Sequence, residues 1–196
     1  MILPPRRHCN HPEPGTRKGS YMTRQILEYA IGPTPLGLLL LAQSPRGVCA
    51  VQFGDSASAL LAELQGLFPA ALLQPGGVLC TQRLARVATL LREPLYPLAL
   101  PLDLQGTAFQ QRVWQALRSI PAGQPLSYRE LAARIGTPSA VRAVASACAA
   151  NRIALLIPCH RVIRSDGSLS GYRWGVQRKQ RLLALEARVC ACSEGG

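Results

Sequence analysis

Two helix-start signatures in the second half of this 196-residue chain constrain its fold more than any other feature. Thr107-x-x-Gln110 and Ser127-x-x-Glu130 have the residue types and spacing of a capping box, and apolar residues at helical spacing follow each of them. They predict one helix over residues 109–119 and a second that ends near Ile135. The second half is therefore expected to be mainly helical.

A third helix is expected directly after the second. Gly136 is a residue that commonly ends a helix, and Thr137 and Pro138 suit an N-cap and a first helical position. They predict a helix over residues 139–149. Helix, glycine turn and helix in this order are typical of a helix-turn-helix, a motif found in many DNA-binding proteins.

Residues 139–149 consist almost entirely of small side chains, and Arg142 is the only long polar one. A helix that reads bases in the major groove usually carries several Asn, Gln, Arg or Lys residues. This helix instead suits close approach to the narrow minor groove, where binding depends little on sequence. The alternative is an alanine-rich helix that only packs against its neighbours.

The positive charge is concentrated in the same region. The formal net charge of +12 divides into +3 for residues 1–19, 0 for residues 20–105 and +9 for residues 106–196. Clustered basic residues favour a polyanion such as nucleic acid as the partner. On charge alone, a genomic bias toward arginine would explain the composition equally well.

The preceding residues, 22–105, alternate short β-like segments with turn residues before turning helical. Antiparallel strands are expected over residues 26–31, 38–42 and 48–53, with a Gly-Pro-Thr-Pro turn after the first. Asp55 or Ser56 would cap a helix over residues 59–68; a second helix would cover residues 81–92, and residues 98–104 would be extended. Because no set of catalytic groups is recognisable here, we expect a small α/β scaffold domain.

Both chain ends carry metal-binding side chains. Residues 1–21 contain four prolines and no hydrophobic period, which predicts a disordered tail. The tail holds His8, Cys9 and His11, and Cys190 and Cys192 lie near the other end. A mobile segment seldom holds a closed coordination sphere, so we predict no metal site.

Cysteine usage and hydropathy indicate the compartment. The seven cysteines are an odd number without the regular spacing of a disulfide framework, and no apolar signal segment stands at the N-terminus. Prolines and glycines break the longest uncharged runs, so no membrane span is expected. We expect a cytoplasmic protein with reduced cysteines.

The candidate reactive centre lies where an apolar run, residues 153–157, ends at Pro158-Cys159-His160-Arg161. We expect a buried strand-like segment that delivers Cys159 beside two cationic side chains. Such neighbours lower the pKa of a thiol toward the range of a nucleophile. Because adjacent side chains seldom hydrogen-bond directly, a water between Cys159 and His160 is the more plausible proton path.

A carboxylate that orients His160 would complete a proton relay. Spacing alone does not choose among the four acidic residues of this half, which are Glu130, Asp166, Glu186 and Glu194. On these residues, a cysteine-histidine hydrolase or acyltransferase remains an alternative. So does a helix-turn-helix regulator in which the cysteine is structural.

The ordered motifs between residues 106 and 188 resemble the O6-alkylguanine-DNA alkyltransferases, also called methylated-DNA-protein cysteine methyltransferases, and most of all their bacterial members. The motifs are FQQRVWQAL, LSYRELA, AVRAVASACAAN, IPCHRV and SGYRWGVQRK. Residues 22–105 match more loosely. The resemblance implies an α/β fold, with a ribonuclease H-like domain over residues 22–105 that contains an antiparallel sheet. A mainly helical, winged-helix-like domain would follow over residues 106–190.

The resemblance also implies an activity, which is DNA repair by direct reversal. The alkyl group of O6-alkylguanine in duplex DNA would move irreversibly to Cys159, once per molecule, after base flipping and without a cofactor. Activity on O4-alkylthymine is left open. His160 would act as the base through water, Glu186 would orient it, and Asn151 would hold the active-site loop. A monomer bound to the minor groove largely independently of sequence is implied, with lesion binding without transfer as the alternative.

The remaining implied site residues divide between the DNA and the base pocket. Tyr128 would donate a proton to the leaving guanine and crowd a phosphate, and Arg142 would fill the vacated stack. The carbonyls of Cys159 and Val162 would read the edge of the guanine. The other implied contacts are Ala143 and Ser146 at the DNA, Tyr172, Arg173 and Lys179 in the pocket, and Trp174, which would narrow it for large alkyl groups.

Overall fold

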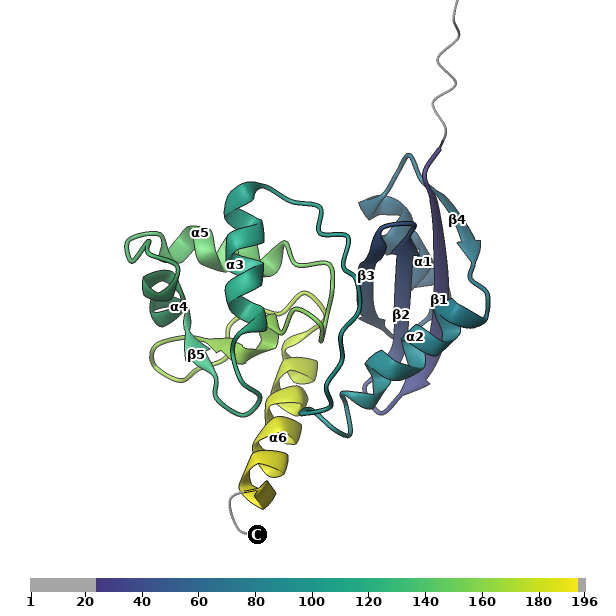
Figure 1. The fold of residues 1–196 in the computed structure, drawn as a ribbon. Helices are drawn as coiled ribbons and strands as arrows, with labels where there is room; N and C mark the ends of the chain where they lie inside the picture. Colours follow the sequence, from purple (N-terminus) through teal and green to yellow (C-terminus); the bar gives the residue numbers. More distant parts are fainter. Residues whose placement is uncertain (1–23, 194–196) are drawn as a thin grey trace, which may run out of the picture.

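The computed structural model describes residues 24–193 and arranges them in two halves that lie side by side (Figure 1). A sheet with two helices forms the half that comes first in the sequence, and helices dominate the second. The long helix α6 (Val176–Ser193) ends the described chain. Within residues 24–193, no helix is both long and apolar enough to cross a membrane. The predicted tail over residues 1–21 lies outside the described residues.

Four strands form the sheet, in the order β3-β2-β1-β4. The predicted antiparallel meander is present as β1 (Ile26–Thr34), β2 (Gly37–Ser44) and β3 (Gly47–Gly54). The first turn lies at residues 35–36, later than expected, because β1 continues through Pro33. A fourth strand, β4 (Leu72–Pro75), was not predicted; it pairs in parallel with residues 26–29 only, which leaves one edge of β1 open at Pro33.

One helix covers each face of the sheet. α1 (Ala57–Leu67) begins at Ser56, whose hydroxyl accepts a hydrogen bond from the Ala59 N–H at 3.2 Å, so Ser56 rather than Asp55 is the cap. α2 (Val78–Thr89) begins and ends three residues earlier than predicted. Strand side chains alternate between the two faces and form one apolar cluster with α1 and another with α2.

Residues 98–104 of the connection between the halves, which were predicted to be extended, belong to no strand of the described sheets. Within residues 98–104, only Leu102 makes a bridge, to Val48 of β3. Pro97 directly precedes this stretch and Pro101 lies within it, and each lacks the N–H that a strand ladder needs.

Both predicted capping boxes are present at the start of the helical half. α3 (Ala108–Arg118) begins after Thr107, and α4 (Tyr128–Arg134) begins after Ser127. In each, the cap hydroxyl accepts from the backbone N–H three residues on, and that residue's side chain accepts from the cap N–H. Gly136 follows α4 with a φ of +72°, the left-handed conformation that glycine adopts without strain.

The third helix of this half, α5 (Val141–Ala149), begins later than predicted, and Thr137 is not its N-cap. The Thr137 N–H donates to the Ala132 carbonyl and the Thr137 carbonyl accepts from the Ala140 N–H, both at 2.9 Å. Thr137 therefore completes the end of α4, and Ala140 takes the cap position. α3, α4 and α5 pack against one another, so the helix-turn-helix order is as predicted.

The apolar run before Cys159 forms a turn and not the predicted strand. Ile153 bridges Val51 of β3, after which residues 154–156 turn, with Leu155 at a φ of +66°. This turn leads into a short 3-10 helix, η1 (Cys159–Arg161). β6 (Val162–Ile163) follows it and pairs in parallel with β5 (Leu126–Ser127).

One apolar core joins the two halves. It includes side chains from β2, β3 and α2 in the first half and from α3, α5 and residues 153–157 in the second. Leu41, Val51 and Leu84 lie on one side of this joint core, and Trp114, Val144 and Ile157 lie on the other. The domain boundary at residue 105 stays a prediction.

Candidate active site

Cys159 lies at the start of η1 with 6% of its surface exposed, in a loop that Asn151 holds together. The Asn151 amide nitrogen donates to Cys159 Sγ at 3.2 Å and to the Ile157 carbonyl at 2.8 Å. The Asn151 side-chain oxygen accepts from the Ile153 N–H at 2.9 Å. One buried amide therefore fixes the turn and the thiol together, in the place predicted for Asn151.

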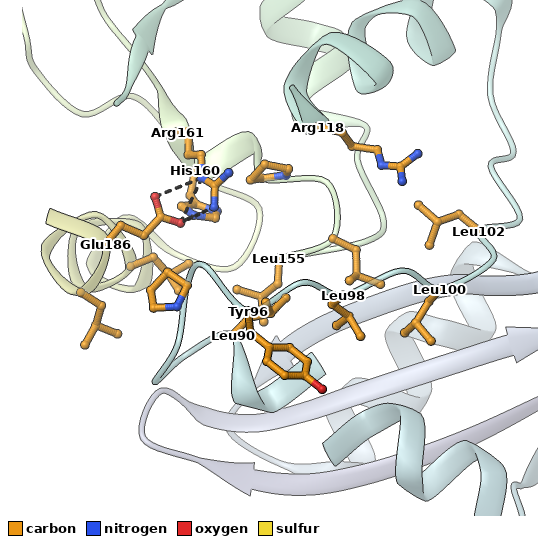
Figure 2. A pocket seen from close by; sticks show the side chains of 15 residues that line it. Leu90, Tyr96, Leu98, Leu100, Leu102, Arg118, Leu155, His160, Arg161 and Glu186 are labelled. Carbon is orange, nitrogen blue, oxygen red and sulfur yellow. Dashed lines mark hydrogen bonds and ion pairs between the residues drawn. The ribbon is translucent and has the colours of Figure 1, made fainter. Parts of the chain in front are cut away.

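His160 and Glu186 form a buried pair beside the thiol, with His160 Nε2 at 2.8 Å from Glu186 Oε1. Arg161 donates to the same carboxylate through Nε at 3.0 Å and Nη2 at 2.8 Å, and it anchors to the Ile120 carbonyl through Nη1 at 2.5 Å. The Gly123 N–H adds a further bond to the carboxylate at 3.2 Å. Figure 2 shows Glu186 reaching from α6 toward both His160 and Arg161, at one end of a leucine-rich cavity of about 240 Å³.

Of the four carboxylates that spacing left open, Glu186 is the one that meets His160. Glu130 instead bonds the Ser127 N–H in its capping box, and Asp166 bonds the Ser168 hydroxyl and N–H. Glu194 lies outside the described residues.

The pair holds a neutral imidazole against an ionised carboxylate. Burial raises the pKa of Glu186, but the hydrogen bonds that its carboxylate accepts from His160 and Arg161 outweigh burial and lower the pKa to about 2. Burial lowers the pKa of His160 more than the neighbouring carboxylate raises it. Because a carboxylate can only accept, His160 Nε2 carries the hydrogen. His160 Nδ1 then carries a lone pair; this atom is buried and has no hydrogen-bond partner within residues 24–193.

The expectation that His160 and Arg161 lower the pKa of the Cys159 thiol is wrong. Burial raises the pKa of the Cys159 thiol, and the Asn151 bond and the charges of Lys179 and Arg173 offset this only in part. The two neighbours that were expected to supply positive charge do not, because His160 is neutral and Arg161 pairs with Glu186. The thiol must therefore lose its proton during the reaction, and this requires a base.

Cys159 opens onto a cavity of about 540 Å³, called here the Cys159 cavity. Residues of α5, among them Arg142 and Ala145, line one side of it, and Arg142, Ala143 and Ser146 are exposed on the outer face of that helix. Further lining residues are Tyr128, Val141, Cys148, Ala149, Arg164, Ser170, Gly171, Tyr172 and Arg173. Of the predicted DNA-contacting and pocket residues, Tyr128, Arg142, Tyr172 and Arg173 therefore line the cavity with the thiol, and Ala143 and Ser146 lie outside it.

Three predicted pocket residues do not line the Cys159 cavity. Val162 and Lys179 are fully buried behind its wall, where Lys179 Nζ donates to the Val162 carbonyl at 2.6 Å. Trp174 is also buried and packs edge-on against Tyr172, with 5.1 Å between the ring centroids. It lines a different hollow, near Leu36. Trp174 therefore cannot narrow the cavity directly.

One polar residue of the site, Ser170, was not predicted; its Oγ lies 2.6 Å from the Tyr128 hydroxyl. Arg161 was expected beside Cys159, but it anchors Glu186 instead of activating the thiol. Arg173, which was predicted, also reaches the sheet half, where it pairs with Glu63 of α1 at 3.1 Å. The only sequence signal for Ser170 was the Ser-Gly-Tyr-Arg motif that contains it, which is part of the resemblance.

The described residues contain no group of three or more His, Cys, Asp or Glu side chains that could hold a metal ion. The tail residues His8, Cys9 and His11 lie outside the described part of the chain, and the side chains of Cys190 and Cys192 are not described either.

Known proteins share these motifs. A family profile described as "6-O-methylguanine DNA methyltransferase, DNA binding domain" matches residues 108–188. The bifunctional transcriptional activator/DNA repair enzyme Ada of Escherichia coli K12 is 55% identical over 161 residues, which are 82% of this chain and 46% of that protein. A methylated-DNA-protein-cysteine methyltransferase of Mycolicibacterium paratuberculosis is 56% identical over 87 residues, covering 44% of this chain and 53% of that protein. The chain thus spans about half the length of the curated relatives it matches.

A solved structure matches over nearly its whole length. The crystal structure of Mycobacterium tuberculosis OGT in complex with DNA is 36% identical, with a TM-score of 0.68, and the match covers 82% of this chain and 93% of that one. Its mixed α/β architecture agrees with the sheet half and helical half described above. At this identity and coverage, the chain belongs to the O6-methylguanine-DNA methyltransferase family.

Proposed function

We propose that this protein repairs DNA by moving the alkyl group of O6-alkylguanine to Cys159 Sγ, once per molecule and irreversibly. One observation carries the proposal. Cys159 is a buried, protonated thiol that faces a cavity of about 540 Å³, and beside it a neutral histidine is held by an ionised carboxylate. Such a pair can remove the thiol proton at the moment of reaction.

The chemistry begins with proton transfer from Cys159 through a water to His160 Nδ1, the buried lone pair without a partner among the described groups. Glu186 stabilises the imidazolium that forms. The thiolate attacks the alkyl carbon, a C–S bond forms, the C–O6 bond breaks, and its electron pair leaves with the guanine. Thiol exchange cannot reverse the resulting thioether, so the protein is consumed. The reaction needs no cofactor.

Tyr128 supplies the proton that the leaving guanine takes up at a ring nitrogen. Burial raises the pKa of its hydroxyl, so Tyr128 is a neutral donor at pH 7. The hydroxyl lies in the wall of the Cys159 cavity, where a base flipped out of the duplex would enter. We propose that Tyr172 and Arg173 contact the base in the same cavity. Lys179 lies behind the cavity wall and supports it through its hydrogen bond to the Val162 carbonyl. The Cys159 carbonyl would read the guanine edge, whereas the Val162 carbonyl lies behind the cavity wall and already accepts from Lys179.

The DNA-facing surface is the exposed side of α5. Its Ala143 and Ser146 are small enough to let the helix approach a minor groove, and Arg142 stands at the cavity, where it would fill the space of the extruded base. The excess of basic residues after residue 105 supplies sequence-independent attraction to phosphate. Extrusion costs a few kcal/mol and least for a damaged pair, so the lesion itself adds selectivity.

Several finer assignments stay proposals. These are the ribonuclease H-like and winged-helix-like descriptions of the two halves, a monomeric state, action in the bacterial cytoplasm, and activity on O4-alkylthymine.

Peptide mass spectrometry after incubation with duplex DNA containing O6-methylguanine tests the proposal. The peptide that contains Cys159 should gain the mass of one methylene group, and the Cys159→Ala variant should gain none. An unmodified Cys159 peptide after full exposure overturns the proposal. Protection of one DNA sequence without loss of the lesion would instead support a regulator, and more than one turnover of a thioester substrate would support a hydrolase.

A further inference from the structure

Ser170 connects the proposed proton donor to a buried cation. Its Oγ lies 2.6 Å from the Tyr128 hydroxyl and accepts a bond from Lys179 Nζ at 3.4 Å. Ser170 and Tyr128 both line the Cys159 cavity, whereas Lys179 is fully buried behind its wall. The Lys179 ammonium also stands 6.0 Å from the centre of the Tyr128 ring.

The chemistry of Lys179 sets the direction of its hydrogen bond to Ser170, whereas either hydroxyl can donate in the Ser170–Tyr128 bond. A lysine ammonium has donors only, so Ser170 Oγ must be the acceptor of the Lys179 bond. The hydroxyl hydrogen of Ser170 then needs an acceptor, and the Tyr128 oxygen is the one that the described residues offer. If Ser170 donates to this oxygen, the hydrogen of the Tyr128 hydroxyl is free to point into the cavity.

We propose that Ser170 is a positioning residue for alkyl transfer, which keeps the Tyr128 hydroxyl directed as a donor toward the base in the Cys159 cavity. The bond from Ser170 and the charge of Lys179 both stabilise the negative charge that grows on the Tyr128 oxygen as its proton leaves. This inference rests on the proposed function. It adds a residue that touches neither the alkyl carbon nor the thiol.

Two substrates distinguish this role from a structural one. The first is O6-methylguanine in a duplex, and the second is its 3-deaza analogue in the same duplex, in which CH replaces the ring nitrogen N3 that Tyr128 would protonate. Single-turnover rates of methyl transfer would be measured for the wild type and for Ser170→Ala, Ser170→Thr and Tyr128→Phe.

We expect Ser170→Ala to slow transfer from O6-methylguanine by about 10- to 100-fold. Ser170→Thr should restore most of the rate, since it keeps the hydroxyl. On the 3-deaza analogue, Ser170→Ala and wild type should react at the same rate, because there is no nitrogen for Tyr128 to protonate. In the Tyr128→Phe background, Ser170→Ala should cause no further loss, since the two residues act as one unit.

Equal slowing of both substrates by Ser170→Ala, with no rescue by Ser170→Thr, would show that Ser170 only supports the loop and overturns the inference. So would an unchanged rate on O6-methylguanine in both variants. Either result leaves the proposed function intact if wild-type Cys159 becomes methylated. Failure of the wild type to methylate Cys159 would instead overturn the proposed function itself.

Discussion

The two halves of the molecule each bury a cysteine near a carboxylate, but they surround these groups differently. In the sheet half, Cys49 is 2% exposed and its Sγ lies 3.5 Å from the Ala42 carbonyl. Burial, and then the charge of Asp103, raise its pKa to about 12. In the helical half, Cys159 is buried almost as deeply, yet an amide donor contacts its sulfur and a histidine base lies beside it.

The two cysteines therefore differ more in the cavity beside them and in their neighbouring groups than in their burial. The hollow beside Cys49 has a volume of about 10 Å³, too small for a substrate, whereas the Cys159 cavity has about 540 Å³. The Asp103 carboxylate accepts a hydrogen bond from Ser44 Oγ at 2.7 Å and forms an ion pair with Arg46 Nη2 at 2.7 Å. The Glu186 carboxylate instead binds a histidine. A buried thiol thus becomes a candidate nucleophile through a base and an adjacent cavity.

Exchanging each cysteine for alanine should separate chemistry from packing. Cys159→Ala is expected to abolish methyl transfer from duplex DNA, because the relay then has no thiol to deprotonate. Cys49→Ala should leave transfer unchanged and lower the free energy of unfolding by about 1 kcal/mol, since it only removes a packed sulfur. Mass spectrometry of the protein and urea unfolding measure the two effects. Residual transfer in Cys159→Ala would show that another group accepts the methyl group.

The two carboxylates offer the second test. Glu186→Gln should slow transfer by about 100-fold or more, because the imidazolium loses its counter-charge. The free energy of unfolding should fall by about 3 kcal/mol, because Arg161 loses its buried anion. Asp103→Asn, the matched control, should cost about 1–3 kcal/mol of stability and leave the transfer rate unchanged. Single-turnover kinetics and urea unfolding are the measurements; equal effects of both variants on transfer would contradict the assignment.

Arginine exchanges should show which half meets DNA. Arg142→Ala should slow transfer from duplex DNA by about tenfold or more, because the extruded base loses the side chain that fills its place. Its reaction with free O6-methylguanine base should be unchanged. Arg86→Ala removes the same charge from an exposed position on α2 and should affect neither reaction. Equal losses of Arg142→Ala on duplex and free base would argue against the proposed role of Arg142.

Acid titration should reveal the buried neutral histidine. Because the pKa of His160 is lowered in the folded protein from its ordinary value of 6.5, the unfolded chain binds a proton that the folded one resists. Stability should therefore be full above pH 6.5 and decline as the pH falls below it. Glu186, whose pKa is about 2 instead of 4.5, adds its own loss only below pH 4.5.

Urea unfolding at pH 7 and pH 5 measures this decline. His160→Gln should flatten the slope between pH 6.5 and 5, whereas Cys49→Ala should keep it. A slope in His160→Gln equal to that of the wild type would assign the decline to other groups.

Features that depend on neighbouring residues could be predicted from the sequence, and features that depend on distant contacts could not. The helix starts at Thr107 and Ser127 follow from hydrogen bonds within four residues. Thr137 has the same residue type as a cap, but its N–H completes α4 instead. The short strand β4 has only four residues and exists through its pairing with β1.

The same distinction applies to the candidate site. Cys159 and His160 could be found because adjacent residues carry the chemistry. The choice of Glu186 among four carboxylates came from the resemblance, and the structure places it against His160 across 26 residues of sequence. Ser170 lies in a motif of the resemblance, but nothing near it in the sequence indicates its partner, because Tyr128 is 42 residues away. The expected lowering of the Cys159 pKa was wrong because burial raises this pKa, and neighbouring residues in the sequence do not show how deeply a side chain is buried.

The bridge between Val51 and the residues around Ile153 determines how the protein could be divided. The Val51 N–H donates to the Arg152 carbonyl, and its carbonyl accepts from the Ala154 N–H, both at 2.9 Å. The family profile begins at residue 108, yet the loop that carries Asn151 and Cys159 is fastened to a strand that lies outside it. A shortened version built on residues 108–188 would leave these backbone groups to water. The sheet half supplies no group to the proposed proton relay, but its strand β3 holds the loop that carries Asn151 and Cys159 in place.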